Sequence, residues 1–268
     1  MLSPRSYLFV PGNRPERFAK ACAAGADAVI IDLEDAVPAA EKPDARVAVS
    51  QWLSPEQPVF VRINAMDTPW FGDDVAACDH PGVAGIILCK AEQLDDPRLQ
   101  ACLSETRPVL PLIETAAGFA NALTLARTKF VQRLIFGTID FQLDLGIQGE
   151  GEELLYFRSE LVLKSRLAGL LAPVDGVVTA IDDADRIRAE TQRARRLGFG
   201  AKLCIHPRQL AAIHAGFGPS DEDIAWAKRV LEAAAASKGA AVKVDGKMVD
   251  RPVIQQAEEI IAESARRS

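Results

Sequence analysis

The chain has 268 residues, of which 49% are hydrophobic and 25% charged, close to the averages of globular proteins. These values exclude collagen-like, disordered and coiled-coil chains, and the length allows one large domain or two small ones. The net charge is −6 and only 6% of the residues are aromatic, so we expect no nucleic-acid partner. No apolar run approaches the roughly 18 residues of a membrane span, so we expect no membrane partner either. The five cysteines form no Cys-x-x-Cys pair, which favours a location in the reducing cytoplasm.

Eight short apolar runs, typical of parallel strands buried on both faces, alternate with helical stretches along the chain. The predicted strands are residues 7–10, 28–33, 59–63, 85–89, 109–113, 133–136, 176–179 and 202–205, and helical stretches include 15–24, 118–128, 156–168, 184–197 and 207–215. The strands repeat about every 28 residues, the length of one βα unit. The sequence therefore predicts an α/β fold, a (β/α)8 TIM barrel over residues 1–236.

A doubly wound open sheet is the structural alternative, but its first βα turn is normally rich in glycine. This chain has Val-Pro-Gly-Asn-Arg there, which disfavours a dinucleotide-binding fold. Residues 237–268 are predicted to form a C-terminal extension, a Gly- and Lys-rich arm followed by a helix over 253–267, which packs on a neighbouring subunit.

Charged residues follow most of the predicted strands, where barrel enzymes carry their active sites. In chain order they are Asp32, Glu34, Asp35, Arg62, Lys90, Glu114, Asp140 and His206. Because unpaired buried charges are strongly destabilising, these groups must pair with one another or with a ligand. We expect Asp32, Glu34, Asp35 and Lys90 to orient the side chains that touch the ligand. His206, before Pro207, is interpreted as a buried, hydrogen-bonded structural histidine, and its alternative role is a catalytic base.

Glu114 and Asp140 follow neighbouring strands, and two carboxylates at one barrel mouth repel each other unless they share a proton or a cation. Oxygen ligands without a histidine or cysteine cluster favour Mg²⁺. The alternative is that each carboxylate caps the helix that follows it.

Arg62 can bind a substrate carboxylate or polarise a carbonyl through charged hydrogen bonds, and its alternative role is a salt bridge to Asp32 or Glu34. Arg14 and Arg17 flank Pro15 at the start of the first helix, where two guanidiniums can bind phosphate. The alternative for these two arginines is an ordinary solvated surface.

Several short segments, in their order and spacing, resemble the citrate lyase β-subunit-like proteins of the HpcH/HpaI aldolase superfamily. They are SYLFVPG at 6–12, DLEDAV at 32–37 with Lys42 and Arg46 downstream, VRIN at 61–64, LIET at 112–115, CIHP at 204–207 and DGKMVDRP at 245–252. The resemblance covers nearly the whole chain.

The resemblance implies a Mg²⁺-dependent acyl-CoA lyase that cleaves or forms a carbon–carbon bond beside a CoA thioester. Family substrates include citryl-CoA, malyl-CoA and citramalyl-CoA, and some members hydrolyse the thioester. By motif, Glu114 and Asp140 match the metal ligands, so that Glu114 also lies against the substrate. Arg62 matches the arginine that contacts the substrate, and Arg14 and Arg17 fall near coenzyme A.

Asp250 matches an aspartate that relatives insert into a neighbouring subunit's site, so the resemblance implies a homo-oligomer, a trimer or a multiple of one. We assign Asp250 the proton exchange with the methyl carbon of the thioester fragment. Relatives often have Ala-Glu-Asp where this chain has Thr138-Ile139-Asp140, which bears on specificity for the acid fragment. Two alternatives stay open: a metal-dependent 2-keto acid aldolase that does not use CoA, and a non-catalytic subunit or binding protein of a larger complex. The latter predicts loss of a metal carboxylate or of Arg62, and neither is lost.

Overall fold

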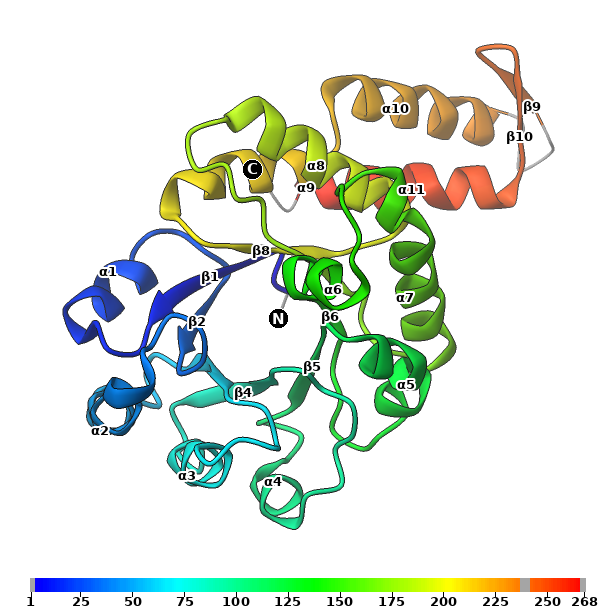
Figure 1. The fold of residues 1–268 in the computed structure, drawn as a ribbon. Helices are drawn as coiled ribbons and strands as arrows, with labels where there is room; N and C mark the ends of the chain where they lie inside the picture. Colours follow the sequence, from blue (N-terminus) through cyan, green and yellow to red (C-terminus); the bar gives the residue numbers. More distant parts are fainter. Residues whose placement is uncertain (1–2, 237–241, 266–268) are drawn as a thin grey trace. The chain divides into compact units, whose positions relative to one another are not determined.

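The computed structural model describes residues 3–236 and 242–265, and its main feature is a closed barrel of eight parallel strands in chain order (Figure 1). The strands are β1 (Ser6–Pro11), β2 (Ala28–Asp32), β3 (Val59–Ile63), β4 (Val83–Leu88), β5 (Val109–Ile113), β6 (Ile135–Phe136), β7 (Val174–Asp175) and β8 (Ala201–Cys204). The barrel closes where β1 pairs with β8, with Ser6 opposite Lys202. The predicted (β/α)8 barrel is confirmed.

Helices follow the strands and surround the barrel. They are α1 (Phe18–Cys22), α2 (Lys42–Trp52), α3 (Phe71–Ala77), α4 (Pro97–Cys102), α5 (Ala116–Ala126), α6 (Thr138–Leu145), α7 (Leu155–Leu167), α8 (Ala184–Leu197) and α9 (Leu210–Phe217). Four short 3-10 helices precede some of them: η1 (Pro15–Arg17), η2 (Ala39–Glu41), η3 (Glu152–Leu154) and η4 (Pro207–Gln209). In the part of the chain that the structure describes, no helix is long and apolar enough to span a membrane.

The barrel interior is filled by alternate side chains of the strands, as the period of two in a strand requires. Tyr7, Ile30, Phe60 and Ile87 belong to this buried cluster, and the rings of Tyr7 and Phe60 meet edge to face at 5.4 Å. Because these side chains fill the interior, the barrel is a packed core and not a pore. Barrel enzymes carry their active sites at the carboxyl end of such a core.

The seventh strand is the one that the sequence misplaced. The prediction was 176–179, whereas β7 is Val174–Asp175. Asp175 is buried and forms ion pairs with Arg158 and Lys202. The apolar run 176–179 comes directly after β7, so a rule that places strands on apolar runs put this strand too late. Asp175 can lie inside the strand because two cations pair with it.

From Ala215 onward the chain forms a second compact unit. It contains α10 (Asp221–Ala236), α11 (Arg251–Ala265) and a hairpin of β9 (Val242–Val244) and β10 (Lys247–Val249). Its core is formed by Ala227, Val230, Val249, Ala257 and Ile260. The unit begins before the predicted arm because α10 packs its apolar side against α11. The first arm residues, 237–241, lie outside the described residues.

Candidate functional site

One cavity of about 540 Å³ brings together most of the charged residues that follow the strands. Its polar lining residues are Asp32, Asp35, Arg62, Glu114, Thr138 and Asp140. Phe9, Leu112 and Leu203 form part of its apolar wall. Charged groups on an apolar floor at the carboxyl ends of barrel strands are the usual layout of a barrel active site.

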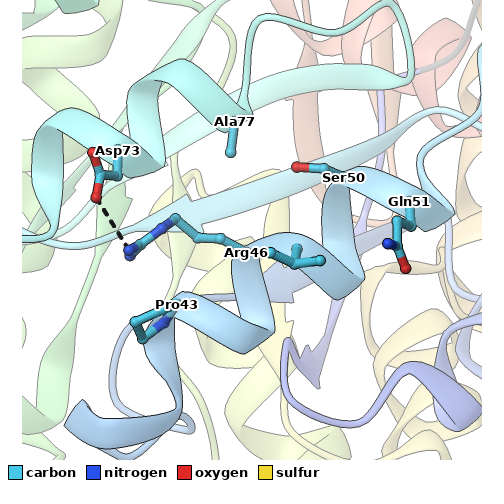
Figure 2. A pocket seen from close by; sticks show the side chains of 7 residues that line it. Pro43, Arg46, Ser50, Gln51, Asp73 and Ala77 are labelled. Carbon is cyan, nitrogen blue, oxygen red and sulfur yellow. Dashed lines mark hydrogen bonds and ion pairs between the residues drawn. The ribbon is translucent and has the colours of Figure 1, made fainter.

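A second hollow of about 490 Å³ lies between α2 and α3 (Figure 2). Its one cationic side chain, Arg46, is paired with Asp73 at 3.2 Å and with Asp74 at 3.1 Å. Because its charge is already balanced, this hollow is the weaker candidate.

Glu114 follows β5 and is 2% exposed. Its Oε1 accepts a hydrogen bond of 2.7 Å from the backbone N–H of Lys90. Burial raises the pKa of Glu114 to about 8, and the nearby charges of Glu34 and Asp140 act in the same direction. The alternative role of a helix cap does not apply to Glu114, because Thr115 is the residue that caps α5.

Asp140 lies in the first turn of α6, whose N-cap position is Gly137, a residue without a side chain that could cap the helix. A Cβ on Gly137 would lie 2.6 Å from Oε2 of Glu114, so the glycine leaves the space that this oxygen occupies. Glu114 and Asp140 both line the same cavity, and the missing side chain at Gly137 leaves space for the Glu114 carboxylate.

The donor set fits a hard divalent cation. Within residues 3–236 and 242–265, no group of three or more His, Cys, Asp or Glu side chains could hold a metal ion. Mg²⁺ is commonly bound by one or two carboxylates and keeps several waters, so Glu114 and Asp140 suffice for it. A cation would also stabilise the buried charge of Glu114, which is otherwise disfavoured.

Arg62 lies opposite Asp32 in the β2–β3 register. Its Nε and Nη2 each donate a hydrogen bond of 2.6 Å to the carboxylate of Asp32, and its Nη1 lies 3.0 Å from Glu34 Oε2. The guanidinium also lies over the ring of Phe9. Burial would lower the pKa of Arg62, but the facing carboxylates of Asp32 and Glu34 raise it well above its usual value. The salt bridge that the sequence left as an alternative is thus present, in a residue that also lines the cavity.

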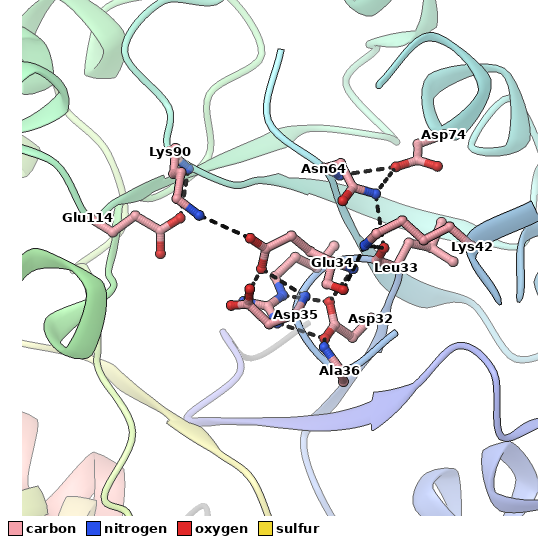
Figure 3. Close-up of polar contacts among 11 residues, drawn as sticks. Asp32, Leu33, Glu34, Asp35, Ala36, Lys42, Asn64, Asp74, Lys90 and Glu114 are labelled. Atoms are coloured by element: carbon pink, nitrogen blue, oxygen red, sulfur yellow. Dashed lines mark hydrogen bonds and ion pairs between the residues drawn. The ribbon is translucent and has the colours of Figure 1, made fainter. Parts of the chain in front are cut away.

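The loop after β2 is held in one shape by hydrogen bonds to Asp32. Its two carboxylate oxygens accept from the N–H groups of Glu34 and Ala36 at 2.9 and 3.0 Å. The buried Lys42 ammonium donates to the carbonyls of Leu33 and Glu34, each at 2.8 Å. Figure 3 shows the Lys42 ammonium beside Leu33 and Glu34. The sequence singled out Lys42 only as part of a motif, and its contacts explain why that position carries a cation.

The pKa values of two carboxylates in this loop are shifted in opposite directions. Burial raises the pKa of Glu34 in principle, but the adjacent Arg62 and Lys90 hold it well below its usual value. For Asp35, burial and the charge of Glu34 raise the pKa to about 6. Glu34 is therefore the fixed anion of the pair, and Asp35 is the one that titrates near neutrality.

The remaining predicted site residues lie elsewhere. Arg14 precedes η1 and Arg17 is its last residue. Both lie near Glu16, at 2.7 and 3.8 Å, and neither lines the cavity. Arg14 nevertheless follows closely on Pro11, which does line it, and donates its N–H to the carbonyl of Pro11. Asp250 is exposed in the second unit and accepts a long hydrogen bond of 3.4 Å from Val253 N at the start of α11.

His206 is hydrogen-bonded as interpreted from the sequence, accepting from the N–H of Arg208 at the start of η4, but it is half-buried and not fully buried. Two residues that shape the structure around the site, Gly137 and Asp74, were not singled out from the sequence. Gly137 could have been found as a glycine directly between a strand and Asp140, a sign of close approach. Asp74, fully buried and bonded to Asn64, carries no sequence signal because acids near a helix start are usually exposed.

A family model described as HpcH/HpaI aldolase/citrate lyase matches residues 5–207. The chain belongs to this family. A citrate lyase subunit beta-like protein of Deinococcus radiodurans is 40% identical over 97% of each chain. A (3S)-malyl-CoA thioesterase of Cereibacter sphaeroides is 35% identical over 97% of this chain and 94% of the relative. Among solved structures, CitE of Mycobacterium tuberculosis in complex with magnesium, acetoacetate and coenzyme A superimposes with a TM-score of 0.88, at 34% identity over 98% of both chains.

Proposed function

We propose that this member of the family is a Mg²⁺-dependent acyl-CoA lyase that cleaves or forms a carbon–carbon bond next to a CoA thioester. The observation that carries the proposal is the convergence of Glu114 and Asp140 on one cavity with the fixed cation Arg62. The names of the relatives, which include citrate lyase and malyl-CoA thioesterase, support the same class of substrate. The magnesium and coenzyme A in the CitE structure support the cofactor and the thioester.

Glu114 and Asp140 would hold Mg²⁺. When bound, the ion supplies Lewis-acid polarisation and a template for the carboxylate and neighbouring oxygen of the acid fragment. The N–H of Lys90 holds Glu114 in place before any ligand arrives, so this carboxylate needs little reorganisation on binding.

Arg62 stabilises the negative charge that develops on the thioester oxygen when the carbon–carbon bond breaks. A guanidinium carries five N–H groups. Nε and Nη2 each use one for Asp32 and Nη1 faces Glu34, so the second N–H of Nη2 is left for the substrate. Asp32 thereby fixes the plane of the guanidinium and hence the direction of this donor.

Asp250 exchanges the proton with the methyl carbon of the thioester fragment, and we propose that it does so in the site of a neighbouring subunit. Its exposure at the junction of β10 and α11 supports this role. The active unit is then a homo-oligomer, a trimer or a multiple of one. Mixing Asp250→Ala with Arg62→Ala subunits should restore part of the activity, because some mixed sites contain both residues. Failure despite proven subunit exchange would leave Asp250 as a helix cap.

Arg14 and Arg17 contact the phosphates of coenzyme A in this proposal. The proposed contact is supported by the position of both arginines just beyond Pro11, which lines the cavity. The five cysteines, all free thiols and four of them buried, support a location in the reducing cytoplasm.

The proposal is tested by incubating the purified protein and Mg²⁺ with a panel of 3-hydroxyacyl-CoA thioesters and following the products by mass spectrometry. Lysis yields a shorter acyl-CoA and an oxo acid, whereas hydrolysis yields free CoA and the intact acid. Glu114→Gln protein is the matched control. A wild-type protein that consumes none of the thioesters but cleaves free hydroxy-oxo acids would replace the proposal with the 2-keto acid aldolase.

A further inference from the structure

Lys90 has an unusual backbone conformation. Its φ is 45°, in the left-handed region that residues with a side chain rarely adopt. It follows β4 by two positions and is followed in turn by Ala91, whose N–H bonds to the carbonyl of Leu112. Neither neighbour is a glycine, and a strained non-glycine residue beside an active site is a reason to look for a role of that conformation.

The left-handed turn directs the Lys90 N–H at the carboxylate of Glu114. The bond to Oε1 is 2.7 Å long, and among the described residues it is the only hydrogen bond recorded to this carboxylate. The other oxygen, Oε2, lies on the side of Gly137. A single backbone donor therefore sets which oxygen of Glu114 is held by the chain and which is left for a ligand.

The side chain of Lys90 acts on a different part of the site. Its ammonium is 3.2 Å from Oε1 of Glu34, while Oε2 of Glu34 is 3.0 Å from Arg62 Nη1. Figure 3 shows Lys90 between Glu114 and Glu34. Glu34 is thus shared between two cations, and removing one of them frees the carboxylate to move relative to the other.

We propose that Lys90 is a positioning residue with two separable roles: its main-chain N–H orients Glu114 for the divalent cation, and its ammonium, acting through Glu34, orients Arg62 for the substrate. The first role needs only the metal site. The second rests on the proposed function, because it concerns the residue that contacts the substrate.

Three substitutions separate the roles. Lys90→Met removes the ammonium and keeps an unbranched side chain, so the turn and its N–H persist. Lys90→Val introduces a β-branched residue that disfavours the left-handed conformation and turns the N–H away from Glu114. Lys90→Gly loses the ammonium but adopts this conformation freely. Lys129→Met, which removes an exposed ammonium lying over Phe130, is the matched control.

The primary readout is Mg²⁺ affinity of chelator-treated protein, measured by titration calorimetry without substrate. Lys90→Val should bind Mg²⁺ about 10–100-fold more weakly, the usual effect of losing a group that orients a metal ligand. Lys90→Gly and Lys90→Met should bind it at least as tightly as the wild type, because they keep the N–H and remove a cation whose charge acts on Glu114. Lys129→Met should bind it like the wild type. The second readout is the affinity for acetoacetate in saturating Mg²⁺, which Lys90→Met and Lys90→Gly should both lower about 10-fold.

Wild-type Mg²⁺ affinity in a folded Lys90→Val protein overturns the main-chain role, and so does an equal loss of Mg²⁺ affinity in Lys90→Gly. Unchanged acetoacetate affinity in Lys90→Met overturns the side-chain role. If the wild type acts on no CoA thioester, the proposed function fails while the calorimetric test of the main-chain role stands, so the two failures are distinguishable.

Discussion

Replacing Asp175 by Asn should destabilise the barrel strongly, because it leaves two buried cations without a counter-charge. Asp175 is 1% exposed, and its oxygens accept from Arg158 Nε at 2.9 Å and Lys202 Nζ at 2.7 Å. The side chains of Arg158 and Lys202 are only 4% and 2% exposed, so water cannot take the place of the carboxylate.

Removing one partner of such a buried ion pair destabilises a protein by about 3–5 kcal/mol. For a cooperative unit that extends to His214, and an unfolding entropy of about 2.1 cal/mol/K per residue, this corresponds to a Tm lower by roughly 7–11 °C. Differential scanning calorimetry at pH 7 measures the shift.

The matched control is Asp182→Asn, which makes the same substitution in an ion pair with Arg208 whose side chains are 70% and 66% exposed. Exposed pairs of this kind contribute at most about 1 kcal/mol, so the control should barely move the Tm. Equal shifts in the two variants would refute the account of Asp175 as the counter-charge of two buried cations.

The pH dependence provides a second check. Burial alone would raise the pKa of Asp175, but Lys202 and Arg158 lower it below its usual value. A depressed carboxylate pKa stabilises the fold fully above about pH 4, where the unfolded group is also ionised, and this contribution is lost as the pH falls through the folded pKa. The Tm difference between wild type and Asp175→Asn should therefore shrink below about pH 4.

Three further predictions concern the cavity. Glu114→Gln and Asp140→Asn should each abolish the thermal stabilisation of chelator-treated protein by Mg²⁺, and full stabilisation of either variant would contradict the metal site. Arg62→Lys should lower kcat about 100-fold or more in steady-state assays, because lysine lacks the planar fork that Asp32 orients; unchanged kinetics would reduce Arg62 to an ion-pair partner. Gly137→Ala should weaken Mg²⁺ binding in calorimetry by about 10–100-fold, since a Cβ would lie 2.8 Å from the Cβ of Glu114, and wild-type affinity would show that Glu114 does not depend on this space.

The barrel was predictable because strands buried on both faces are continuous apolar runs, and β3 and β5 have the predicted bounds. The same rule failed at β7, which ends at Asp175, just before the apolar run 176–179 on which the strand was predicted. A local pattern cannot show that Arg158, on a helix 17 residues earlier, and Lys202, on the next strand, supply the compensating charges.

The residues of the cavity were predictable from their place after the strands, but their pairing was not. Whether Arg62 faces Asp32 depends on the β2–β3 register, and a shift by one residue would turn the side chain to the other face. The φ of Lys90 depends on how the turn after β4 meets β5, which no pattern of side chains encodes. Sequence therefore located the chemical groups, and the backbone decides which of them act together.

The pairing of β1 with β8 bears on the order in which the chain is built. Ser6 lies opposite Lys202, which is 196 residues later in the sequence. β1 therefore cannot pair with β8 until almost the whole barrel has been synthesised. Until then the growing sheet has two open edges, each with unpaired N–H and carbonyl groups that can bind other chains. Synthesis of this protein thus includes a long interval of aggregation risk that ends only when β8 leaves the ribosome.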